Sequence, residues 1–211
     1  MQNAAGGIVL CGGRSRRMGR PKALLPFGPE QMLQRVVRLL GEAVQPVVVV
    51  AAADQELPEL PADVPIVHDR RPDCGPLEGL AVGLGYVRDR VERAFVTACD
   101  VPLLTPALVR RMIDLCAGFD VAVPHVAGFD EPLAAVYAVS VLADVERLLA
   151  EDRLRPAFLF ERVRTRRVSA DELRDVDPEL GSLANVNTPD DYRAALAILA
   201  SERRKRGMEE S

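Results

Sequence analysis

The sequence has no tryptophan, and aromatic residues make up only 4% of its 211 positions. Hydrophobic residues nevertheless account for 48% of the chain, which is enough to bury one core. Leucine, valine and alanine must therefore do most of the packing. Long apolar runs are also absent, since Val47–Ala53 is far shorter than the ~20 residues that a membrane-spanning helix needs. We expect one domain over residues 1–202 and a disordered charged tail over 203–211.

An excess of positive charge is missing as well. The formal net charge of −4 excludes a protein that coats nucleic acid through its overall charge, so an anionic ligand would have to meet a local basic patch. The N-terminal segment has neither a basic start nor a long apolar stretch, and no secretory signal is expected. These absences predict a cytoplasmic protein without a membrane or nucleic-acid partner.

Cysteine and histidine are scarce and scattered. The four cysteines show no CxxC spacing, which is typical of free thiols in a reducing compartment and argues against a disulfide framework or a zinc site. Cys11 and Cys99 stand in apolar segments, which favours packing over nucleophilic chemistry. His68 and His125 have no partner in an obvious catalytic motif. We interpret all four residues as structural.

Short apolar segments alternate with segments of helical spacing over the first hundred or so residues. The expected strands are 7–11, 47–50, 64–68, 94–98, 121–124 and 133–137, and the expected helices are 32–44, 77–91, 105–117, 141–151, 156–162 and 188–201. Pro65 moves the third strand toward an edge of the sheet. This order predicts an α/β fold, a three-layer sandwich with a mostly parallel sheet and helices on both faces.

The loop after the first strand concentrates glycine and positive charge. Its glycines are Gly12, Gly13 and Gly19, and its cations are Arg14, Arg16, Arg17, Arg20 and Lys22. In α/β sheets ligands bind at the carboxyl ends of the strands, where this loop lies. Glycines let backbone N–H groups turn toward an anion, and arginine and lysine bind phosphate oxygens. The pattern is neither a Walker loop nor a GxGxxG loop, so it predicts a different kind of phosphate site.

At these residues the chain resembles the nucleotidyltransferases built on a Rossmann-like sheet, and within them the molybdenum cofactor guanylyltransferase family. The resemblance runs from about Gly7 to Tyr192. Besides the loop it rests on Asp69, Gly75-Pro76-Leu77-Glu78-Gly79, Cys99-Asp100-Val101-Pro102, Glu131–Tyr137 and Asn185-Val186-Asn187-Thr188-Pro189. It implies transfer of GMP from GTP to the terminal phosphate of molybdopterin that carries molybdenum, with release of pyrophosphate and formation of the guanine dinucleotide. It further implies Mg²⁺ as cofactor, a cytoplasmic location and contact with molybdoenzyme maturation proteins.

Three residues carry the expected chemistry. Asp100 follows a buried strand, so its carboxylate should project at the ligand edge of the sheet, and the resemblance makes it the Mg²⁺ ligand. Lys22 would stabilise the negative charge that accumulates during transfer. Arg17 is expected as a second clamp on the triphosphate. The alternative roles are an aspartate that caps the next turn and ordinary exposed cations.

The resemblance also implies a set of binding residues. The nucleotide and acceptor are expected at Leu10, Cys11, Gly12, Gly13, Lys22, Asp69, Gly75, Asp100, Asn185 and Asn187. The two asparagines would line the acceptor side, and Asn187 or Thr188 could also cap the last helix. Asp69 could alternatively be a turn residue, and Gly75 the start of a helix.

Four positions bear on the base preference. Gly12 favours a purine, because the cytidylyl relatives usually carry alanine there and a missing Cβ leaves room near the loop. The asparagines at positions 185 and 187 also favour the guanylyl branch, because the cytidylyl branch tends to have aspartates at these two positions. Ala51 departs from the pattern, since guanylyl members carry an asparagine there that contacts the nucleotide, and backbone or Asp54 would have to replace it.

Other functions stay open at this point. The nearest is a molybdopterin cytidylyltransferase or a sugar-phosphate or phospholactate enzyme of the same fold. A second is a non-catalytic nucleotide-binding adaptor in molybdoenzyme maturation, although Lys22 and Asp100 together argue for turnover. A third is a hydride-transfer dehydrogenase, which the glycine spacing disfavours.

Overall fold

The computed structural model describes residues 3–12, 21–71 and 74–209. Its main sheet has the strand order β10-β7-β9-β6-β1-β4-β5, with β8 paired to β7. The strands are β1 (Asn3–Leu10), β4 (Val47–Ala51), β5 (Ile66–His68), β6 (Val91–Ala98), β7 (Val121–Val126), β8 (Phe129–Asp130), β9 (Ala134–Ala138) and β10 (Thr165–Ser169). Only the pairs that involve β9 or β8 are antiparallel. The mostly parallel sheet is therefore confirmed.

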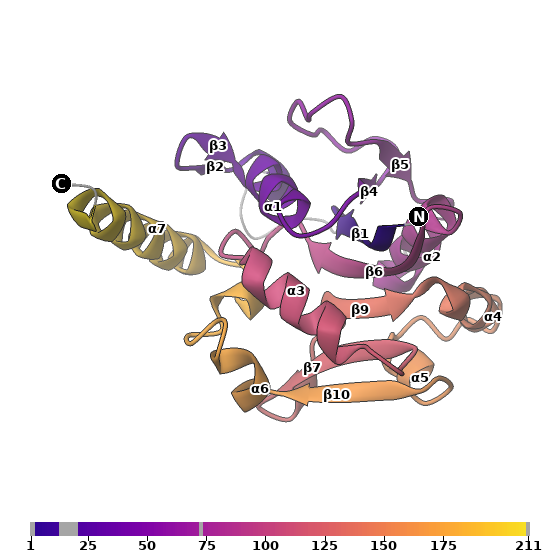
Figure 1. Ribbon diagram of the computed structural model, residues 1–211. Coiled ribbons are helices and arrows are strands. Elements are labelled where there is room, and N and C mark those ends of the chain that lie inside the picture. The colour runs from indigo at the N-terminus through magenta and orange to yellow at the C-terminus, as the bar shows by residue number, and fades with distance from the viewer. Residues whose placement is uncertain (1–2, 13–20, 72–73, 210–211) are drawn as a thin grey trace.

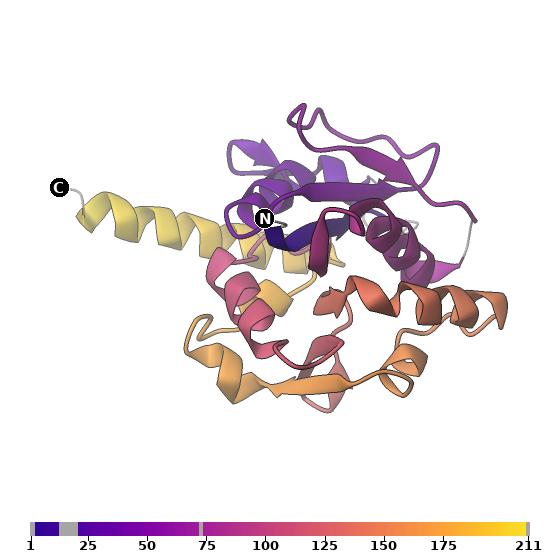
Figure 2. The ribbon, with the colours of Figure 1, turned by 45° about the vertical axis from the view of Figure 1, so that its right-hand side comes forward.

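Helices cover both faces of this sheet (Figures 1 and 2). The helices are α1 (Met32–Gly41), α2 (Gly75–Val87), α3 (Pro106–Leu115), α4 (Leu142–Ala150), α5 (Ala157–Phe160), α6 (Ala170–Arg174) and α7 (Pro189–Glu209). One core packs α1, α3 and α6 against one face, and a second core packs α2, α4 and α5 against the other. The predicted three-layer arrangement is thus confirmed, and the alternation of side chains along β1 shows why. Val9 and Cys11 belong to the first core, whereas Ile8 and Leu10 belong to the second.

The central strands are apolar on both faces because both faces are covered. All five residues of β4 are buried, and β1 lies between β4 and β6 in parallel register, with Leu10 opposite Val50 and Ala98. β5 ends the sheet on one side, as Pro65 predicted. This order brings the carboxyl ends of β5, β4, β1 and β6 to one edge of the sheet.

A small third core lies beside the sheet. The hairpin of β2 (Pro26–Phe27) and β3 (Glu30–Gln31) packs on α7 through Leu25, Phe27, Met32, Val186, Ala195 and Leu199. Three short 3-10 turns, Lys22–Leu24, Val139–Val141 and Gly181–Leu183, complete the described elements. The far end of α7 projects away from the body of the molecule (Figure 1).

The structure differs from the sequence-based expectation at several boundaries. α1 ends at Gly41 rather than Val44, and α2 spans Gly75–Val87 rather than 77–91, because Val91 already pairs with β1 as the start of β6. α7 continues to Glu209, so the tail expected to be disordered from residue 203 is helical as far as the structure describes it. Its run of charged residues consists mainly of good helix formers, which explains the continuation.

Several elements were not predicted, among them β10 and α6. β10 has only one buried side chain, Val168, because it is an edge strand, and its alternation is too weak to recognise. α6 follows it directly and begins with a capping box, in which Ser169 and Glu172 satisfy each other's backbone. The Ser-x-x-Glu spacing was a usable signal for this short helix.

Candidate active site

Three residues that are far apart in the chain meet at the ligand edge of the sheet. The Lys22 ammonium donates hydrogen bonds to Asp100 Oδ2 and to Asn187 Oδ1, each at 2.7 Å. The side chains of Lys22 and Asp100 are mostly buried, with 16% and 15% of their surface exposed. The structure therefore brings together the cation, the carboxylate and one of the two asparagines that the sequence predicted for this site.

The backbone of the central strands places Asp100. The Cys11 N–H donates to the Val50 carbonyl at 2.7 Å and the Cys99 N–H donates to the Leu10 carbonyl at 3.0 Å, which extends the parallel pairing beyond the ends of β1 and β6. Asp100 is the next residue after Cys99, at the point where β6 leaves the sheet. Its carbonyl accepts the Val186 N–H at 2.8 Å, which ties the segment before α7 to the site.

One oxygen of Asp100 is left without a partner. Asp100 Oδ1 is buried and has no hydrogen-bond partner among the described residues, while Oδ2 accepts from Lys22. Buried carboxylate oxygens are normally hydrogen-bonded, because an unsatisfied charged group is costly. An oxygen in this state is poised for a donor or a cation that comes with a ligand.

The start of α7 fixes Asn187. The Asp191 carboxylate accepts the N–H groups of Asn187 and Thr188 at 2.9 and 2.8 Å, and the Thr188 hydroxyl accepts the Asp191 N–H at 3.2 Å. The hydrogen bond from the Asn187 N–H, followed by those from Thr188, lowers the pKa of Asp191. Thr188 is thus the cap, and Asn187 is free to face Lys22. Asn185 is exposed and makes no hydrogen bond with this cluster in the described part of the chain.

The other predicted nucleotide residues lie along the same edge, toward β5. The Asp69 N–H donates to the Ala51 carbonyl at 3.0 Å, which continues the pairing of β4 and β5. Burial, followed by the charge of Glu78, raises the pKa of Asp69. Gly79 lies against these strand ends, since a Cβ there would be 3.1 Å from Leu10 Cδ2 and 3.7 Å from Asp69 Oδ1.

Gly75 and Gly12 both leave open space. Gly75 begins α2 with φ of +67°, a conformation that a residue with a Cβ rarely adopts, and a Cβ there would have no neighbour within 4 Å. A Cβ on Gly12 would also meet nothing within 4 Å among the described atoms. The backbone at both positions is therefore accessible to a ligand. Gly13 and Arg17, which the sequence also predicted for this site, lie outside the described residues.

A buried carboxylate beside this edge was not predicted. Glu78 is fully buried in the first turn of α2, and its two oxygens accept hydrogen bonds from Arg70 and Arg71 at 3.0–3.3 Å. The signal was present in the sequence, because Glu78 is an acid between apolar Leu77 and Leu80 and follows two consecutive arginines. A charge in that position is buried only when it is paired.

Cys11, Cys99 and His125 have packing or pairing partners of their own, and His68 is exposed at the end of β5. Cys11 and Cys99 are buried side by side, and the hydrogen bond between the two thiols, together with burial, raises the pKa of Cys99. His125 Nδ1 lies 2.7 Å from Asp130 Oδ1 across the pair of β7 and β8. Neither pair bonds to the cluster of Lys22, and no group of three or more His, Cys, Asp or Glu side chains in the described ranges could hold a metal.

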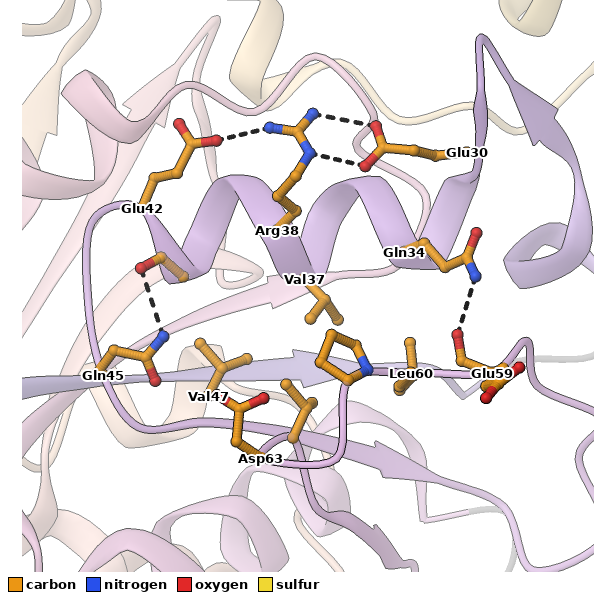
Figure 3. A pocket seen from close by; sticks show the side chains of 13 residues that line it. Glu30, Gln34, Val37, Arg38, Glu42, Gln45, Val47, Glu59, Leu60 and Asp63 are labelled. Atoms are coloured by element: carbon orange, nitrogen blue, oxygen red, sulfur yellow. Dashed lines mark hydrogen bonds and ion pairs between the residues drawn. The ribbon is translucent and has the colours of Figure 1, made fainter.

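A groove outside this cluster has a volume of about 640 Å³ and lies between α1 and residues 59–64 (Figure 3). Arg38 on its rim is held by Glu30 at 2.7 Å and by Glu42 at 2.6 Å. None of the predicted site residues lines this groove. Among the described residues, no helix has the length and apolar character that crossing a membrane requires.

One known protein family matches most of this chain. The model of the MobA-like NTP transferase domain matches residues 7–167, which include Lys22, Asp69 and Asp100. The chain belongs to the MobA-like NTP transferase family. It is therefore a member of a family of nucleotidyltransferases, as the glycine and arginine loop indicated.

Similar proteins align with most of the length of this chain. A probable molybdenum cofactor guanylyltransferase from Pelotomaculum thermopropionicum is 34% identical over 199 residues, which cover 94% of this chain and 95% of the relative. A protein of the same name from Mycobacterium tuberculosis is 37% identical over 189 residues, which cover 86% of this chain and 88% of the relative.

A solved structure confirms the fold. The molybdopterin-guanine dinucleotide biosynthesis protein A of Archaeoglobus fulgidus superposes with a TM-score of 0.77 at 24% identity, over 93% of this chain and 99% of the other. The Rossmann-like fold expected for this MobA-like transferase is thus confirmed.

Proposed function

We propose that this chain transfers GMP from GTP to the terminal phosphate of molybdopterin that carries molybdenum, and so forms molybdopterin guanine dinucleotide and pyrophosphate. The observation that carries the proposal is the contact of Lys22 with Asp100, beside a buried oxygen of Asp100 that has no partner among the described residues. The names of the relatives support the same reaction. We further propose that the reaction takes place in the cytoplasm and that its product passes to molybdoenzyme maturation proteins.

The residues present fit a Mg²⁺ ion. Mg²⁺ is usually held by one or two carboxylates and completes its shell with phosphate oxygens and water, so a single aspartate suffices. Asp100 would hold it through Oδ1, the oxygen that no described residue contacts by a hydrogen bond. The bound ion would offset negative charge on the α-phosphate and on the departing pyrophosphate.

The chain's own residues supply positioning and charge. An oxygen of the acceptor phosphate attacks the α-phosphorus, the bond from that phosphorus to the bridging oxygen of the β-phosphate breaks, and pyrophosphate leaves with the electron pair. A phosphate monoester is largely deprotonated at neutral pH, so the acceptor needs no general base. Lys22 stabilises the charge that accumulates on the transferring group, because its ammonium sits in a mostly buried position where electrostatic interactions are strong.

Asn187 connects the site to the acceptor. Its amide oxygen accepts from Lys22, which leaves the amide N–H groups to donate to an acceptor phosphate. Because Asp191 and Thr188 hold the backbone here, the amide is presented from a fixed point at the start of α7. Asn185, exposed two residues earlier, would contact the acceptor farther from the transferring phosphorus.

The nucleotide would lie along the carboxyl edge of the sheet. Its phosphates would meet Lys22 and the arginine loop, which includes Gly13 and Arg17, and its base would lie over Leu10, Cys11 and Gly12 toward Asp69 and Gly75. Gly12 supports a purine because no described atom fills the space that its missing Cβ leaves. A Gly12→Ala change therefore disturbs no described contact of the protein itself, and any effect it has reports on the ligand.

The experiment that tests the base is product analysis with mixed nucleotides. The protein is incubated with molybdopterin carrying molybdenum, Mg²⁺ and equal concentrations of GTP and CTP, and the dinucleotides are separated by mass. We expect the guanine product to dominate, and Gly12→Ala to lower its yield relative to the cytosine product, while Gly85→Ala, which also adds a methyl group in open space, leaves the ratio unchanged. A cytosine product alone would establish the cytidylyl alternative. Tight GTP binding without any product would establish the adaptor.

A further inference from the structure

Glu78 is a fully buried charge that no step proposed above uses. It sits in the first turn of α2 with none of its side chain exposed, beside the apolar residues Leu77 and Leu80. Its Oε1 accepts from Arg70 Nε at 3.3 Å, and its Oε2 accepts from Arg71 Nε at 3.2 Å and Nη2 at 3.0 Å. Burying a carboxylate is costly even when it is paired, and an apolar side chain would fill the same space at lower cost. The arrangement points to a role for the arginines that Glu78 holds.

The two arginines face outward from this anchor. The side chains of Arg70 and Arg71 are 56% and 49% exposed, although both guanidinium groups contact a carboxylate that is not exposed at all. Arg70 donates to Glu78 only through Nε, and neither of its terminal nitrogens donates a hydrogen bond within the described part of the chain. Glu78 therefore holds the Arg70 guanidinium through Nε, and the two terminal nitrogens present a planar fork of N–H donors.

This fork lies at the ligand edge of the sheet. Arg70 directly follows Asp69, whose N–H pairs with the end of β4, and Gly79, next to Glu78, packs on Leu10 and near Asp69. Ala51, at the end of β4, is fully buried, its methyl side chain can make no hydrogen bond, and its carbonyl already accepts from the Asp69 N–H. Among the described residues, the polar side chains that directly follow the end of β5 at this edge are those of Asp69 and Arg70.

A carboxylate beside a guanidinium fork matches one nucleobase. Guanine presents two acceptors, O6 and N7, that a guanidinium contacts with two parallel hydrogen bonds, and its N1–H and N2 amino groups are donors that a carboxylate accepts. Adenine replaces O6 with an amino group, and cytosine has no counterpart of N7. The pair of donor fork and acceptor therefore favours guanine over both.

We propose that Arg70, held in place by buried Glu78, is a specificity-determining residue that binds O6 and N7 of guanine next to Asp69. Glu78 is then a positioning residue, and Arg71 completes the neutralisation of its charge. The inference rests on the proposed function, because it takes the nucleotide to lie along this edge. It adds the side chains that select the base.

The test is equilibrium competition for a fluorescent GTP analogue in the presence of Mg²⁺. GTP, ATP and CTP are titrated as competitors against the full chain and against Arg70→Met, Arg70→Lys and Glu78→Gln. The matched control is Arg88→Met, because Arg88 is an arginine of similar exposure, 59%, at the other end of α2. Asp54→Ala is included because Asp54 follows β4 in an exposed loop and could contact a base instead.

We expect Arg70→Met to weaken GTP binding about tenfold, the discrimination that one bidentate contact provides, and to change ATP and CTP binding less than twofold. Arg70→Lys keeps the charge without the fork and should recover only part of the preference. Glu78→Gln should reduce the preference in the same direction, a readout that a purely structural role would not move. Arg88→Met and Asp54→Ala should leave the preference unchanged.

The outcomes separate the inference from the proposed function. A GTP preference that survives Arg70→Met, or that Asp54→Ala abolishes, overturns the role of Arg70 and leaves the proposed function standing. If the unaltered chain binds no nucleotide with Mg²⁺ present, both are overturned. If Glu78→Gln does not fold, the two Arg70 variants still decide, because the Arg70 side chain is mostly exposed.

Discussion

At the scale of single residues, the site depends on charges that are held where water has limited access. Lys22 and Asp100 were predicted from the loop and from the end of a buried strand, and the structure places them 2.7 Å apart. The contact of Asn187 with Lys22 could not be predicted, because it depends on how α7 returns to the sheet. The burial of Glu78 was not predicted, because the apolar spacing of its helix indicates a core position but does not show which residues pair with its one acid.

Replacing Lys22 by Met tests the charge at the transferring group. We expect the single-turnover rate of transfer to fall by about 10²–10³, the loss seen when one stabilising donor is removed from a transition state. Lys22→Arg should lie between, because it keeps the charge and changes its geometry. The exposed Arg88→Met serves as the control. A Lys22→Met rate within threefold of the unaltered protein would contradict the role.

The cysteines give a second prediction at this scale. The hydrogen bond from Cys11 and burial raise the pKa of Cys99, and burial raises that of Cys116, so little thiolate exists at either position at neutral pH. Cys74 is only half-buried. A thiol reagent at pH 7.5 should therefore modify Cys74 first and the others only as the pH rises or the protein unfolds. Mass spectrometry after partial modification checks this order, and early labelling of Cys99 would contradict it.

At the scale of elements, strands that are buried on both faces were the most predictable feature. β1, β4 and β6 were recognised because the buried positions of a strand covered on both sides are almost all apolar. Edge elements were less predictable: β10 and the hairpin of β2 and β3 have few buried side chains, and their existence depends on partners distant in sequence. The observed helix ends differ by a few residues from the predicted ends where the next strand begins earlier than expected, as at Val91, which already pairs with β1.

The packing of α2 on β1 can be tested with two glycines of the same helix. A Cβ on Gly83 would lie 2.6 Å from Ile8 Cγ2, a buried atom that cannot move away, whereas a Cβ on Gly85 would meet nothing within 4 Å. Gly83→Ala should destabilise the protein by about 1–3 kcal/mol through overpacking. Gly85→Ala should stabilise it by about 0.5–1 kcal/mol because alanine favours the helix. Denaturant unfolding of both variants measures the difference, and equal effects would contradict this packing.

At the scale of the whole molecule, two cores share one sheet and a third joins α7 to it. The alternation of strands and helices predicted the layers, and β5 at the edge followed from Pro65. The length of α7 was underestimated, because a charged sequence can form a helix without packing against anything. The functional edge was predictable as a location, since parallel strands collect their carboxyl ends there, but the partners within it were not.

The attachment of α7 predicts which part of it matters for stability. Leu199 is 6% exposed and packs in the third core, whereas the residues from 203 onward add no side chain to that core within the described range. Leu199→Ala should therefore lower stability by about 2–4 kcal/mol. Deleting residues 203–211 should cost much less, because Arg203 and Arg204 are exposed and lie outside the described core. Thermal melting of the two variants compares them, and a larger loss from the deletion would show that the tail packs elsewhere.

The most direct test of the account is Mg²⁺-dependent pyrophosphate release from GTP with molybdopterin as acceptor, measured for the unaltered chain and for Asp100→Asn. Asparagine keeps the shape of the side chain and removes the charge that would hold the metal. We predict release that requires Mg²⁺ and falls at least a hundredfold in Asp100→Asn, with both proteins folded by circular dichroism. Equal release by the two proteins, or release that does not depend on Mg²⁺, would contradict the site at Lys22 and Asp100.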